Sequence, residues 1–152
     1  DEVMVNDFTN RIFGQNGQSV RDYFLKNSYN KYVVTPARET QGTANDGVIN
    51  ISLDMAHPDC HSKEDNTCTT RQRAVFSAAY AALDQYIDLS TYDSNGDGFI
   101  KPSELSVMFV FAGYDAAAGG NRRPYIWPHK FAHNNETIDG VTINAYCLFA
   151  DF

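Results

Sequence analysis

Hydrophobic residues follow two different periods along this chain, and the two periods predict helices in some stretches and strands in others. The strongest helical period lies in TTRQRAVFSAAYAALDQYI, residues 69–87, where apolar residues recur at steps of three and four. A second helix is expected in VRDYFLKNSY, residues 20–29, because its apolar residues share one face and Ser19 can act as the N-cap.

Strands are predicted where apolar and β-branched residues form short runs. The expected strands are MVNDF (4–8), KYVVTPARE (31–39), VINISL (48–53), YIWPH (125–129) and VTINAYCLF (141–149). LSVMFVFAG, residues 105–113, is a strand candidate that could also continue as a helix, because a run this short cannot be typed by period alone. YDAAAGGNRRP, residues 114–124, is expected to form a turn.

Length and composition favour one mixed domain. The chain has 152 residues, of which 43% are hydrophobic and 20% charged, so it can bury a core of its own. With helices and strands mixed, we predict an α/β (α+β) fold over residues 1–152, a mixed twisted sheet with packed helices.

The formal net charge of −7 argues against nucleic acid or an anionic membrane as a partner and suits cation binding. No apolar run is long enough to cross a bilayer, and the first residues lack the features of a signal peptide. The chain does not begin with Met and stops on an apolar run, so we expect both ends to be cut from a longer protein.

The stretch YDSNGDGFIKPSEL, residues 92–105, carries the strongest chemical motif. It matches the twelve-residue calcium loop D-x-[DN]-x-[DN]-G-x5-E, which supplies the six to eight oxygen ligands that Ca²⁺ prefers. The metal ligands predicted from this spacing are Asp93, Asn95, Asp97, the carbonyl of Phe99, and Glu104.

Two features of this loop qualify the prediction. Lys101 occupies the ninth position, where it cannot ligate a cation, so a water or a vacancy is expected there. The alternative interpretation is a solvated turn rich in Asp and Asn without any metal. Because regulatory calcium loops occur in pairs, a single loop predicts a structural clamp rather than a sensor.

Cys60 and Cys68 enclose a short polar loop and are predicted to form a disulfide, which would indicate an oxidising compartment. A zinc site and free thiols remain alternatives for the same cysteines; the zinc ligands would be His57, Cys60, His61 and Cys68. If the protein is secreted, the third cysteine, Cys147, is expected to have its partner beyond residue 152.

Three other groups of residues are weaker candidates. His129 and His133 in HKFAH have the spacing of a helical zinc motif, but Lys130 stands where a catalytic Glu would be, so surface or loop histidines are expected. His57 and His61 are also interpreted as solvated loop residues. Arg122 and Arg123 could receive a carboxylate, although solvated basic residues are the expectation.

Several segments, in this order, resemble the catalytic domain of the immune inhibitor A family of secreted bacterial metallopeptidases. The segments are SVRDYFLKNSYNKY, ALDQYIDLSTYDSNGDGFI, VMFVFAGYDAAAGG, YIWPHKF and GVTINAYCLF. This resemblance implies a zincin-like fold, a structural calcium bound by Asp93, Asn95, Asp97 and Glu104, a secreted location, and zinc-dependent endopeptidase activity on peptide or protein substrates.

The resemblance implies no catalytic residue within this chain, because the family's H-E-x-x-H helix lies downstream of the strand that INAYCLF resembles. We therefore expect the N-terminal part of a metallopeptidase catalytic domain, a monomer that is inactive alone, with zinc present only in the full-length enzyme. The alternative is a non-enzymatic, calcium-stabilised extracellular binding or adhesion module.

Overall fold

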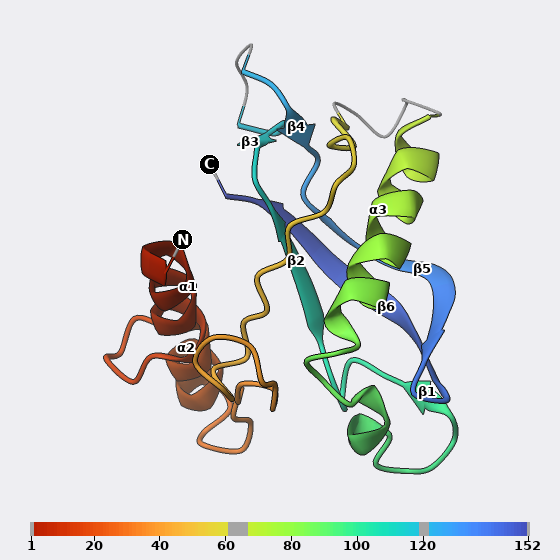
Figure 1. Cartoon of the computed structure of the whole chain (residues 1–152). Coiled ribbons are helices and arrows are strands. Elements are labelled where there is room, and N and C mark those ends of the chain that lie inside the picture. Colours follow the sequence, from red (N-terminus) through yellow and green to blue (C-terminus); the bar gives the residue numbers. More distant parts are fainter. Residues whose placement is uncertain (1, 61–66, 119–121, 152) are drawn as a thin grey trace. The chain divides into compact units, whose positions relative to one another are not determined.

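The computed structural model of the chain describes residues 2–60, 67–118 and 122–151. It divides into two compact units, the first made of Asp1–Ile51 and Gln85–Ile87, the second of Ser52–Asp84 and Asp88–Phe152. The second unit holds the sheet and every residue predicted to bind calcium (Figure 1). Within the described ranges, no helix has the length and apolar character needed to cross a membrane.

Two helices make up the regular structure of the first unit. Helix α1, Glu2–Phe13, occupies the place of the predicted strand 4–8; that prediction is wrong because Met4, Phe8 and Ile12 recur every four residues, a helical period. Helix α2, Val20–Asn27, confirms the second predicted helix. Its cap is also confirmed, since the Ser19 hydroxyl accepts a hydrogen bond from the Asp22 N–H at 3.0 Å.

The strands predicted over 31–39 and 48–53 are absent from the described chain. In the second stretch, the Gln41 side chain binds both backbone groups of Asn50, accepting from its N–H at 2.5 Å and donating to its carbonyl at 2.7 Å. The buried Glu39 carboxylate accepts from the N–H groups of Gln41 and Asp46 at 2.7 and 3.0 Å. Side chains therefore satisfy the backbone that a strand partner would otherwise bind.

The main sheet of the second unit is built around its last strand, β6, Val141–Ala150. Strands β1, Phe99–Ile100, and β2, Val107–Phe111, both pair with β6 in parallel, whereas β5, His129–Ile138, pairs with it antiparallel. The predicted strand 141–149 is confirmed, and the segment left open between strand and helix is strand β2.

Most of strand β5 was not predicted from the sequence, because the predicted strand 125–129 reaches only its first residue, His129, and surface or loop histidines were expected for His129 and His133. The signal for it is the Asp139–Gly140 pair, whose φ angles of 52° and 79° form the tight turn between β5 and β6. Asp-Gly between two alternating runs is a strong hairpin signal, because both residues tolerate positive φ.

Helix α3, Cys68–Leu83, confirms the strongest predicted helix but ends four residues before the predicted residue 87. Figure 1 shows it lying along the sheet. The centre of the contact is the fully buried Phe76, whose ring centroid lies 4.6 Å from that of Phe109 on β2 and 4.5 Å from that of Tyr146 on β6. These aromatic contacts hold helix and sheet together.

A small parallel ladder, β3 (Tyr114–Asp115) with β4 (Tyr125–Ile126), lies at one end of the second unit, and β1 lies at the opposite end (Figure 1). The strand predicted at 125–129 is confirmed only for β4, and β3 lies in the predicted turn 114–124. Together, three α-helices and two sheets in the described chain confirm a mixed α+β fold.

Candidate calcium site and its surroundings

The acidic loop begins after the 3-10 helix η1, Leu89–Tyr92, and runs into β1. Gly98 has a φ of 79°, so the chain reverses at the position where the calcium motif requires glycine. Two positions later Ile100 is buried at 3% exposure, and its strand pairs with Thr142 and Ile143 of β6. The loop is thereby attached to the central strand of the sheet.

Asp93, the first predicted ligand, organises the backbone of this loop. Its Oδ1 accepts hydrogen bonds from the N–H groups of Gly96 and Asp97 at 3.0 and 3.2 Å, and its Oδ2 accepts from Gly98 N–H at 2.8 Å. Three backbone donors therefore converge on one carboxylate and fold the loop around it.

Asn95 and Asp97, the next two predicted ligands, each accept one backbone hydrogen bond. Asn95 Oδ1 accepts from Asp97 N–H, and Asp97 Oδ1 accepts from Phe99 N–H, both at 2.9 Å. The other oxygen of Asp97 contacts the Lys101 ammonium. This pair lowers the pKa of Asp97 and raises the pKa of Lys101, mainly through the hydrogen bond between them.

Glu104, the last predicted ligand, reaches back across the loop. Its Oε1 accepts from the N–H and hydroxyl of Ser94 at 3.0 and 2.7 Å, and its Oε2 accepts from Lys101 N–H at 3.1 Å. The Ser94 hydroxyl is the main cause that lowers the pKa of Glu104. The Glu104 side chain therefore joins the end of the twelve-residue loop to its beginning.

The donor set fits calcium in chemical kind and order, because carboxylate, amide and carbonyl oxygens stand at the motif positions. In the conformation described, however, the carboxylates bind backbone donors and Lys101. Among the residues that the structure describes, no three His, Cys, Asp or Glu side chains gather around one point as metal ligands do. A bound calcium would therefore require Lys101 to leave Asp97 and Glu104 to turn inward.

Cys60 and Cys68 form a disulfide, as predicted, with 5.2 Å between their Cα atoms. The zinc and free-thiol alternatives for these two cysteines are therefore wrong, because both sulfurs are oxidised; His61 of the zinc set lies outside the described residues. Cys147 on β6 is a free cysteine.

His57 is not the solvated side chain that the sequence indicated. Its Nδ1 accepts a hydrogen bond from Asp59 N–H at 2.9 Å, and its Nε2 is buried without a hydrogen-bond partner. The neighbouring Asp59 carboxylate accepts from Tyr125 N–H at 2.7 Å and pairs with Arg123 at 2.8 Å. Sequence reasoning missed this cluster because Arg123 lies far from Asp59 along the chain.

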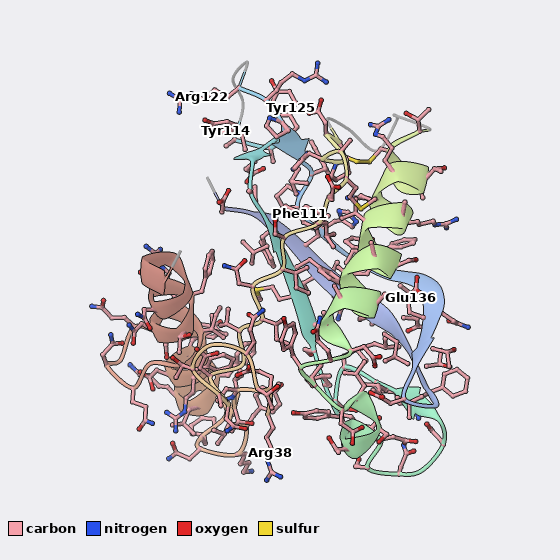
Figure 2. All side chains as sticks on the ribbon, viewed as in Figure 1. Arg38, Phe111, Tyr114, Arg122, Tyr125 and Glu136 are labelled. Atoms are coloured by element: carbon pink, nitrogen blue, oxygen red, sulfur yellow. A yellow bond between two sulfur atoms is a disulfide. The ribbon has the colours of Figure 1, made fainter. Side chains whose placement is uncertain are left out.

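Arg123 thus receives a carboxylate from within the chain. Its guanidinium also lies 5.6 Å from the ring centroid of Tyr125, while that of Arg122 lies 5.7 Å from the ring centroid of Tyr114. Figure 2 shows Arg122, Tyr114 and Tyr125 close together at the β3–β4 end of the unit. Both arginines are therefore positioned by aromatic rings.

The helical zinc motif considered for HKFAH does not apply, because this segment is part of β5. His129 Nδ1 lies 2.6 Å from the Trp127 carbonyl, and its Nε2 lies 3.0 Å from the Tyr146 hydroxyl. The carbonyl requires a proton on Nδ1, so Nε2 accepts from the tyrosine. His129 links β5 to β6.

Comparisons of the chain with models of protein families, with curated proteins and with solved structures found no significant match.

Proposed function

We propose that residues 93–104 bind one calcium ion that stabilises the second unit, and that this unit is part of the catalytic domain of a secreted, zinc-dependent endopeptidase. The observation that supports the calcium site best is the closure of the loop around Asp93, with positive φ at Gly98 and the buried Ile100 joined to β6. The calcium ligands would be the oxygens of Asp93, Asn95, Asp97, Phe99 and Glu104.

Calcium in this loop would act through structure rather than catalysis. When bound, it would neutralise three carboxylates that otherwise repel one another. The loop connects η1 to β1, and β1 pairs with β6 at Phe99 and Ile100. Fixing the loop would therefore stabilise one end of the parallel pairing around β6.

The calcium proposal is tested by calorimetry and by thermal unfolding with calcium and with chelator. At calcium concentrations about a hundredfold above Kd, binding to the folded state alone would raise Tm by roughly 5–10 °C. The variant Asp93→Asn is expected to lose this calcium-dependent shift, and Asp54→Asn, an exposed aspartate elsewhere in the same unit, is expected to keep it. No heat of binding and an unchanged Tm would contradict the proposal.

The peptidase proposal is supported by the order of motif segments along the chain and by the Cys60–Cys68 disulfide, which hints at an oxidising compartment. In the full-length enzyme, zinc would polarise the scissile carbonyl of a peptide substrate. This chain contributes scaffold, so the pure 152-residue protein is expected to show no peptide hydrolysis. Chelator-sensitive proteolysis by this protein would overturn that expectation.

The sequence encoded downstream gives the direct test of the peptidase proposal. An H-E-x-x-H motif within about a hundred residues after Phe152 would support it, since the zinc ligands of a metallopeptidase take that form. A domain boundary in its place would favour a calcium-stabilised binding module. The calcium experiment is independent of this outcome.

A further inference from the structure

We propose that residues 57–60, termed the strap, form an acid-sensitive device. The strap is held against the ends of β2 and β4 while the His57 imidazole is neutral, and it is released when the imidazole takes up a proton. The argument rests on the hydrogen bonds of His57, on the backbone conformation of Asp59, and on the groups that surround the ring.

The closed strap depends on a lone pair of His57. Nδ1 accepts from Asp59 N–H at 2.9 Å, so in the neutral ring the proton must be on Nε2. Asp59 has a φ of 44°, a left-handed conformation that is unusual for a residue with a side chain. The hydrogen bond to His57 is one of the contacts that hold this conformation.

The other contacts attach the strap to β4 and α3. The Asp59 carboxylate accepts from Tyr125 N–H at 2.7 Å, and Cys60 N–H donates to the Tyr125 carbonyl at 2.8 Å. Arg71 on α3 donates to the carbonyls of Pro58 and Asp59 at 2.6 and 3.3 Å. Both backbone groups of Tyr125 are therefore bound by the strap.

The other side of the imidazole is closely packed. His57 Nε2 is buried, and a Cβ placed on Gly113 would lie only 3.2 Å from it. The ring meets Phe111 of β2 edge to face, with 5.9 Å between centroids. A weak backbone hydrogen bond with Ala112 raises the His57 pKa, but Nε2 has no hydrogen-bond partner of good geometry.

A proton on Nδ1 would point at the Asp59 N–H, so two donors would face each other and the bond would be lost. The charged groups around the ring are already engaged. The Asp59 carboxylate of the strap binds Arg123, and Asp151 Oδ1, just after β6, accepts from Gly113 N–H at 2.7 Å. Arg71 on α3 donates to the carbonyl of Pro58, the residue after His57. A protonated His57 is satisfied only if the strap moves.

The pKa of His57 agrees in sign with this mechanism. Burial is the largest effect and lowers it below the ordinary 6.5, although Asp59, the Ala112 carbonyl and Asp151 oppose the shift. An imidazole released with the strap regains its ordinary pKa, so acidification favours the open form. The Cys60–Cys68 disulfide keeps the released strap joined to α3, which makes the opening local.

The test is amide hydrogen exchange of the full chain at about pH 7.5 and about pH 5.5, compared as protection factors and followed by an NMR titration of His57. Protection of the Asp59, Cys60 and Tyr125 amides is expected to fall on acidification. The fall should be about tenfold for each unit by which the pKa of His57 is lower in the closed form than in the open form. The fall should lie between the ordinary value of 6.5 and the lower pKa of the closed form, which the titration of the His57 ring measures.

The matched control is His57→Asn, because the amide oxygen of Asn can accept from an N–H two residues later but does not titrate. This variant is expected to keep its protection at both pH values. Protection in the wild type that does not depend on pH would overturn the proposal, as would an equal loss in His57→Asn. If the variant does not fold, a wild-type loss of protection that lies outside this pH range overturns it as well.

Discussion

At the scale of single residues, Lys101 changes the charge balance of the acidic loop. It stands at the ninth motif position, where it cannot itself ligate a cation, and its ammonium contacts Asp97, while Glu104 and Asp93 also raise its pKa. A cation carried by the chain itself therefore offsets part of the repulsion between the carboxylates. The loop keeps its shape through Lys101 and backbone donors, and calcium must compete with the lysine for Asp97.

This competition predicts the effect of Lys101→Met. Removing the ammonium is expected to tighten calcium binding by roughly two- to fivefold, the size of an exposed ion pair. Isothermal titration calorimetry measures the change, and Lys31→Met, an exposed lysine in the first unit, serves as the control. Unchanged or weaker binding in Lys101→Met would show that the lysine does not compete.

At the scale of elements, the contact between α3 and the sheet depends on aromatic side chains. Phe76 stacks on Phe109 with 24° between the rings and lies edge-on to Phe111 at 6.1 Å between centroids. Tyr80, one turn further along α3, meets Phe109 at 5.4 Å. Phe76 therefore contacts aromatic rings from both β2 and β6, and its removal should leave a cavity.

We predict that Phe76→Ala lowers the free energy of unfolding by about 3–5 kcal/mol, because a fully buried aromatic side chain is lost and the cavity cannot collapse completely. Urea denaturation measures the change. Phe131→Ala on β5 is the matched control, since 63% of that residue is exposed, and it should cost about 0.5 kcal/mol or less. Equal effects of the two substitutions would place Phe76 outside the core.

The disulfide joins the strap to the first residue of α3, with a sequence separation of 8. Replacing both cysteines by serine is expected to reduce the free energy of unfolding by about 2–3 kcal/mol, mainly because the unfolded chain gains freedom. The same measurement under reducing conditions should bring the wild type close to the variant. A variant as stable as the oxidised protein would contradict this.

The elements that the sequence predicts well are those in which side-chain period and tertiary contact agree. Residues 69–83 form a helix, and 141–149 a strand, because each period places one apolar face toward the other element. The failures occur where local side chains bind the backbone, as Gln41 does at Asn50. The spacing of hydrophobic residues gives no information on hydrogen bonds between side chains and the backbone.

The functional residues also fall into a group that the sequence predicts and a group that it does not. The calcium ligands come from one continuous stretch, so their spacing alone predicts them. The His57 cluster combines the strap with Gly113, Arg123 and Asp151. Gly113 and Asp151 come together through the parallel pairing of β2 and β6, and Arg123 joins the strap through its ion pair with Asp59. No local pattern indicates contacts of this sequence separation, and a single sequence therefore predicts the loop but not the cluster.

At the scale of the whole molecule, acidic residues outnumber basic ones, 19 to 12. Many of the described carboxylates are stabilised by backbone N–H groups rather than by cations. Asp93 accepts three such bonds, Glu39 two, and Asp151 one. These contacts stabilise carboxylates in a chain of net charge −7 without a cation beside them, and they make its stability depend on the carboxylates remaining ionised.

We therefore predict that stability falls on acidification in two steps, in the presence of chelator. His57 has a lowered pKa in the folded state, so the unfolded state binds more protons just below pH 6.5 and stability falls there first. Asp97 and Glu104 also have lowered pKa values in the folded state. Their contribution to stability is therefore complete above their ordinary pKa values of 3.8 and 4.5, and it is lost as the pH falls through the pKa values of the folded state.

Urea denaturation at a series of pH values separates the two steps. His57→Asn should remove the first step and leave the second, whereas Asp97→Asn should weaken the second and leave the first. If stability fell only in the range where carboxylates titrate, the half-buried imidazole would contribute nothing to folding, and the lone pair on Nδ1 would not be what holds the strap.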